Sequence, residues 1–143
     1  MDITSTRSAH SGKVLAAFLI VTCALLGGPV FAKGSGSLQP APKGWMVVRS
    51  GAANTNANYD KEDRDINGKL MNVSVLCKGT KNAPALIATD GTRTWGATYG
   101  VSSTTTIWNK GGKVYKDPLD DNPNHCLIDG LGLGDLKGIW HMH

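Results

Sequence analysis

The sequence predicts an all-β domain, a small antiparallel barrel or sandwich of about seven short strands with one disulfide. The first observation is a set of two-residue sequences typical of β-hairpin turns, at Asn67-Gly68, Asp90-Gly91 and Gly111-Gly112. The second is an alternation of apolar and polar residues between these turns, which is typical of strands with one buried face. The third is a series of glycines between residues 130 and 138, where each glycine would cost a helix about 1 kcal/mol.

The predicted strands are short apolar or alternating segments that lie between polar and glycine-rich ones. In residues 70–77, the side chains of Met71, Val73, Val75 and Cys77 share one face, which we expect to be the core face. An acidic segment with prolines, residues 117–125, is expected to be a loop. The seven strands are expected at residues 45–49, 70–77, 83–88, 92–101, 104–108, 114–116 and 139–143.

Residues 1–32 have the layout of a secretory signal peptide. Arg7 and Lys13 precede an uncharged run, residues 14–32, and cleavage is expected near Ala32, where the run ends in small residues. The alternative is an uncleaved anchor, because the run is just long enough to span a bilayer. We therefore expect a secreted or periplasmic protein with no stable membrane span once the leader is removed.

The rest of the chain is expected to consist of a tether and one domain. Residues 33–44 are rich in Gly, Ser and Pro and predict a flexible tether, and residues 45–143 predict a single β-rich domain that is a monomer. The formal net charge is +4 without a block of basic residues, so nucleic acid is not an expected partner. Cys77 and Cys126 are the two cysteines after the leader, and in an oxidising compartment we expect a disulfide between them.

One candidate metal site resembles the opening half of a calcium-binding loop. Asp63, Asp65 and Asn67 place oxygen atoms at alternate positions, and Gly68 follows where a sharp turn is needed. The residue expected to be a bidentate Glu is Ser74, in a predicted strand. The alternative is a charged hairpin whose Asn-Gly pair makes the turn.

A second candidate metal site lies at the C-terminus. His141 and His143 share one face if the segment is a strand, with Met142 between them and His125 upstream. Imidazole and thioether ligands suit copper, and imidazole alone also suits zinc. The alternative is a terminal segment with two solvated histidines.

The aromatic residues suggest a ligand-binding surface. Arg93, Trp95 and Tyr99 alternate in the predicted strand 92–101 and would lie on one face, where they could stack on a sugar or anchor a protein. The alternative is that the tryptophans fill the core.

Familiar catalytic motifs such as Gly-x-Ser-x-Gly are absent from the sequence. We therefore expect a non-catalytic binding protein whose partner is a protein, a glycan or an envelope component. One alternative is a small secreted copper- or zinc-binding protein that uses the C-terminal His-Met-His. Another is a secreted hydrolase that uses His125 with Asp121.

Overall fold

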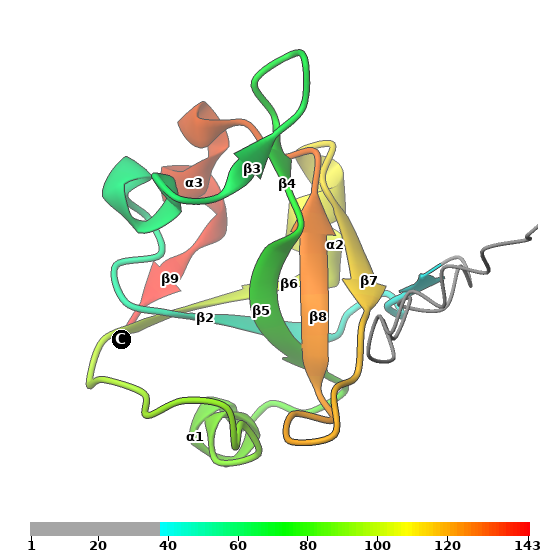
Figure 1. Ribbon diagram of the computed structural model, residues 1–143, viewed down its shortest axis with the longest axis vertical. Helices are drawn as coiled ribbons and strands as arrows, with labels where there is room; N and C mark the ends of the chain where they lie inside the picture. Colours follow the sequence, from blue (N-terminus) through cyan, green and yellow to red (C-terminus); the bar gives the residue numbers. More distant parts are fainter. Residues whose placement is uncertain (1–37) are drawn as a thin grey trace, which may run out of the picture. The chain divides into compact units, whose positions relative to one another are not determined.

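The computed structural model describes residues 38–143, so the predicted signal peptide, its cleavage near Ala32 and the first part of the tether lie outside the described residues. The described chain is mostly β, with a seven-stranded antiparallel sheet and a two-stranded sheet (Figure 1). The large sheet has the order β1-β7-β8-β5-β2-β6-β9, and its two edge strands do not pair with each other. The predicted all-β class with one disulfide is confirmed, in an open, sandwich-like form and not as a closed barrel.

The elements are short. The strands are β1 Gln39–Pro40, β2 Met46–Ser50, β3 Asp63–Arg64, β4 Leu70–Met71, β5 Val73–Lys78, β6 Tyr99–Ser103, β7 Lys113–Lys116, β8 His125–Asp129 and β9 His141–Met142. The helices are η1 Asn56–Tyr59, α1 Ala83–Ile87, α2 Thr104–Asn109, η2 Leu133–Asp135 and α3 Leu136–Ile139. Within residues 38–143, no helix is long and apolar enough to cross a membrane.

The sheet is strongly curved, which gives it two different faces. In Figure 1, β5, β8 and β7 run side by side, whereas β2 and β6 run across them. One side, here called the core face, carries most of the buried apolar residues, including Val47, Val75 and Ile128. The other side, the α1 face, is covered in part by α1, whose Leu86 packs with Leu76 of β5.

Two predicted strands are helices instead. In the segment predicted as strand 83–88, the side chain of Asn82 accepts a hydrogen bond from the Ala85 backbone N–H at 3.0 Å and caps α1. In the segment predicted as strand 104–108, the Ser103 hydroxyl accepts from Thr106 N–H at 3.1 Å and caps α2. Local capping therefore outweighed the apolar and β-branched composition of both segments.

Other boundaries also differ from the prediction. Asn67-Gly68 lies between β3 and β4 as expected, but the other two predicted turns follow helices and do not join hairpins. Residues 92–98 are irregular, so only the end of the predicted strand 92–101 belongs to β6. At the C-terminus, α3 ends at Ile139 before the short strand β9. Asn72 has a φ of 53°, which breaks the alternation and leaves Met71 exposed while Val73 stays buried.

The sheet begins earlier in the chain than the predicted domain boundary at residue 45. β1 pairs with Tyr115 and Lys116 of β7, and the next residue, Ala41, is buried. The amide of Ala41 donates a hydrogen bond to the carbonyl of Val114 at 2.9 Å. This part of the predicted flexible tether is therefore the edge of the sheet.

The predicted disulfide is present. Cys77 on β5 and Cys126 on β8 are bonded, and their Cα atoms are 5.8 Å apart. Both side chains are buried on the core face. β8 is a central strand and begins at His125, so the last residue of the segment predicted as a loop, residues 117–125, belongs to the same strand as Cys126.

Candidate functional site

Two polar side chains face each other across β5 and β8 on the α1 face. Ser74 pairs with Leu127 and Leu76 pairs with His125, so Ser74 and His125 are diagonal neighbours on one face. The Ser74 hydroxyl lies 2.7 Å from Nε2 of His125. The antiparallel register therefore places a hydroxyl against an imidazole nitrogen, from residues 51 positions apart in the chain.

The opposite nitrogen of the same imidazole is held by Asp117, directly after β7. His125 Nδ1 lies 3.1 Å from the Asp117 carboxylate and 2.9 Å from the Asp117 carbonyl oxygen. Both of these oxygens are acceptors, so Nδ1 carries the hydrogen and donates it. In the neutral imidazole, Nε2 is then the acceptor that faces the Ser74 hydroxyl. The Asp117 and His125 side chains are only 9% and 10% exposed, which keeps this orientation away from bulk water.

A guanidinium group stands over the serine. Arg93 Nη2 is 3.3 Å from the Ser74 hydroxyl oxygen, and Nη1 is 3.4 Å from the hydroxyl of Ser50. Arg93 Nε is 3.3 Å from the carboxylate of Asp90, whose side chain is fully buried. The Arg93 side chain is 43% exposed, so solvent reaches this side of the site.

Asp90 fixes the arginine in place. Its carboxylate accepts hydrogen bonds from Thr92 and, at 2.9 Å, from the Trp95 indole N–H. Burial acts to raise the pKa of Asp90, but these hydrogen bonds and the charge of Arg93 outweigh it and hold the pKa below its usual value. The ionised carboxylate therefore keeps Arg93 anchored at neutral pH.

A second arginine holds the backbone of the same strand. Arg49 Nη1 donates to the Ser74 carbonyl at 3.0 Å, and its Nη2 is 2.7 Å from the Glu62 carboxylate. Its guanidinium lies 4.3 Å from the ring centre of Tyr59. Burial raises the pKa of Tyr59, so this ring stays neutral at physiological pH. The strand segment that carries Ser74 is thus tied down from both sides.

The arrangement has the order of groups that activates a serine. A hydroxyl faces the free nitrogen of an imidazole, whose other nitrogen is oriented by a carboxylate. The pairing of β5 with β2 covers Leu76 to Lys78, whereas Ser74 itself is paired with Leu127 of β8. The Arg93 side chain is a donor beside the hydroxyl and can stabilise a negative charge that develops there.

Three residues predicted for different sites meet here. His125 was a candidate metal ligand, and Arg93 and Trp95 were candidates for ligand binding. Sequence reasoning missed Ser74 and Asp117, and named Asp121 as the acid that works with His125. The available signal was Ser74 on the polar face of an alternating strand, but its partners become visible only when β5 and β8 are paired.

The other predicted ligand residues lie toward the opposite edge of the same face. Tyr99 stacks on His143, with ring centres 5.3 Å apart and planes 12° apart. His141 meets the His143 ring edge-on at 5.1 Å. His125 is not brought to these histidines, because β5, β2 and β6 lie between β8 and β9. Among residues 38–143, no three His, Cys, Asp or Glu side chains form a group that could hold a metal ion.

The predicted calcium ligands form a turn. The Asp65 carboxylate accepts the backbone N–H groups of Asn67 and Lys69, both at 2.8 Å. Asp63 lies in β3, opposite Met71. One carboxylate is thus used to hold the hairpin, as in the alternative interpretation of this sequence.

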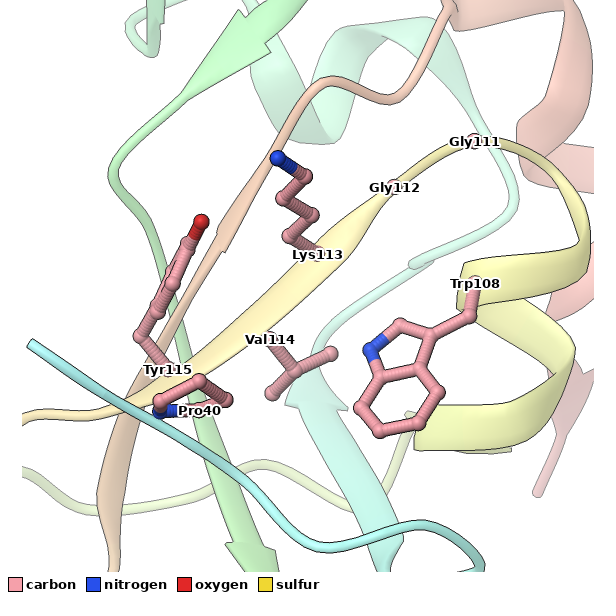
Figure 2. A pocket seen from close by; sticks show the side chains of 7 residues that line it. All are labelled: Pro40, Trp108, Gly111, Gly112, Lys113, Val114 and Tyr115. Atoms are coloured by element: carbon pink, nitrogen blue, oxygen red, sulfur yellow. The ribbon is translucent and has the colours of Figure 1, made fainter.

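An apolar groove with a volume of about 550 Å³ lies at the edge of the sheet. Its lining residues are Pro40, Trp108, Gly111, Gly112, Lys113, Val114 and Tyr115. Figure 2 shows the indole of Trp108, on α2, pointing toward Val114, with Lys113 and Tyr115 on the other side of β7. The sequence predicted none of these residues as a site.

Comparison with protein-family models, with curated protein sequences and with solved structures finds no match to this chain.

Proposed function

We propose that this domain is a serine-dependent hydrolase that cleaves carboxylic esters. The observation that carries the proposal is the continuous chain from Asp117 through His125 to the Ser74 hydroxyl, at 3.1 Å and 2.7 Å. This favours the hydrolase alternative over the non-catalytic role expected from the sequence. It also replaces Asp121 with Asp117 as the acid.

The first half of the reaction forms an acyl-enzyme. Nε2 of His125 takes the proton from Ser74 as the Ser74 oxygen attacks the ester carbonyl carbon, and the carbonyl π electrons move to its oxygen. Arg93 stabilises that negative oxygen. The C–O bond to the alcohol then breaks, His125 gives its proton to the leaving oxygen, and the acyl group stays on Ser74.

The second half repeats these steps with water. His125 takes a proton from a water molecule, the water oxygen attacks the acyl carbon, and the carboxylic acid leaves as Ser74 regains its proton. Loss of one oxyanion donor costs a hydrolase roughly 10²–10³ in rate, and the side-chain donor beside Ser74 is a single arginine, Arg93. Esters, which are more reactive than amides, are therefore the substrate class that the geometry favours.

The proposal is tested with a chromogenic acetyl ester and with a fluorophosphonate, which bonds to an activated serine. We expect the fluorophosphonate to add to Ser74, read by peptide mass spectrometry, and Ser74→Ala to lower kcat/KM by about 10³ or more. Ser102→Ala is the matched control, because this hydroxyl on β6 is buried and has no hydrogen-bond partner. A wild-type protein that neither hydrolyses the ester nor reacts at Ser74 would contradict the proposal.

A second candidate function, the binding of a glycan, is favoured by the apolar groove. Its volume of about 550 Å³ lies within the usual range for small-molecule sites, roughly 300–1,000 Å³. Trp108 provides a ring surface in this groove on which a sugar can stack. Titration with oligosaccharides, followed by calorimetry, is expected to show binding that Trp108→Ala removes and that Ile66→Ala, at the exposed β3–β4 turn, leaves unchanged.

A further inference from the structure

The α1 face carries a row of side chains that runs from Ser74 to the C-terminus. Ser50 of β2 is bound by the same arginine as Ser74, and it pairs directly with Tyr99 of β6. Tyr99 in turn exchanges backbone hydrogen bonds with His143, at 2.9 Å and 3.2 Å. Directly paired residues of neighbouring strands share a face, so these four side chains form one line across the sheet.

The far end of this row is a flat aromatic surface. The rings of Tyr99 and His143 are nearly parallel, and His141 supports His143 edge-on. His143 is exposed, so the outer side of the stack is open to a ligand. Stacked aromatic rings attract other flat rings with an apolar face, whether aryl groups or sugars.

The separation along the row fits a substrate that reaches from one end to the other. Adjacent strands are about 4.8 Å apart, so the backbones at Ser74 and Tyr99, two strands apart, are separated by roughly 10 Å. Arg93 lies over the start of the row, beside Ser74 and Ser50. An ester carbonyl at Ser74 can thus place its alcohol part along the row toward Tyr99.

We infer that the ester's alcohol is a ring-bearing group, a sugar or an aryl alcohol, whose ring stacks on Tyr99 and His143. The inference rests on the proposed function, because it assigns the direction in which a substrate of Ser74 extends. His143 is then a specificity-determining residue, while Ser74, His125 and Asp117 carry the chemistry.

The test compares acetyl esters of three alcohols, with the protein purified from its own host. Benzyl acetate is the aryl arm, a 6-O-acetyl methyl glucoside is the sugar arm, and butyl acetate is the open-chain reference. We expect kcat/KM for at least one ring ester to exceed that for butyl acetate by about tenfold, the scale of one aromatic stacking contact. The ring ester that gains most identifies the class of alcohol.

The variant His143→Ala separates recognition from folding, because the His143 side chain is exposed and is not part of the buried core. It is expected to raise KM for the preferred ring ester about tenfold, with kcat and the butyl acetate kinetics unchanged. Equal rates for all three esters, or an equal loss for all three in His143→Ala, would overturn the inference and leave the hydrolase proposal standing. No hydrolysis of any ester together with no labelling of Ser74 would overturn both.

Discussion

Removal of the Cys77–Cys126 disulfide is expected to destabilise the domain strongly. The bond joins β5 to β8 across a sequence separation of 49. For a closed loop of that length, the chain-entropy relation gives a loss of about 4 kcal/mol at 25 °C. In a domain of roughly 100 residues, this corresponds to a fall in melting temperature of roughly 15–20 °C.

Urea unfolding followed by tryptophan fluorescence measures the effect in the double variant Cys77→Ala/Cys126→Ala. A steeper dependence of the unfolding free energy on urea in the variant than in the wild type would show that the unfolded chain without the crosslink exposes more surface. Wild-type protein reduced with dithiothreitol is the control, because it lacks the crosslink but keeps both sulfur atoms in the core. A loss below about 1 kcal/mol in both proteins would refute the loop-entropy reasoning.

Two further predictions concern single residues. Because the pKa of Asp90 is held below its ordinary value of 3.8, the charged carboxylate stabilises the fold above that pH, and this contribution disappears as the pH falls through the lowered pKa. The Asp90→Asn variant is therefore expected to have a free energy of unfolding about 2 kcal/mol lower than that of the wild type at pH 7, and a smaller deficit below about pH 4. Urea unfolding of both proteins at the two pH values measures this deficit, and a deficit that is the same at both would contradict the prediction. Gly100→Ala would place its Cβ 2.6 Å from that of Ala53 and is expected to cost about 1–3 kcal/mol. Gly134→Ala, whose Cβ meets nothing within 4 Å, is its control and is expected to change stability by less than about 0.5 kcal/mol, so equal thermal shifts would contradict the packing argument.

The sequence predicts correctly those features of the fold that depend on local alternation of apolar and polar residues. The alternation in residues 70–77 predicts that Val73, Val75 and Cys77 point into the core, and this is confirmed. The prediction for Met71 was wrong, because the positive φ of Asn72 shifts the alternation by one position. Periodicity does not show such a break, because it depends on the backbone conformation of Asn72, a residue type that adopts a positive φ more often than most.

The candidate site could not be predicted from such local patterns, because its residues come together only through the pairing of distant strands. Ser74 looked like an ordinary polar residue of a strand, and Asp117 like one of several acids in a loop. Each residue gains a partner only when β5, β8 and the end of β7 lie side by side. The capped helices were also missed, since a short capping contact outweighs composition over only five or six residues.

The register between β5 and β8 links the disulfide to the site. Ser74 and Cys77 are three positions apart on β5 and point to opposite faces, as do the adjacent His125 and Cys126 on β8. A slip of one residue in β5 would turn Ser74 toward the core and Val75 toward the imidazole, which would end the hydrogen bond to Nε2. The crosslink on the core face forbids that slip, because it joins the same two strands at a fixed position. A disulfide at an edge strand would stabilise the chain without fixing this pairing, so its central position serves the alignment of Ser74 with His125.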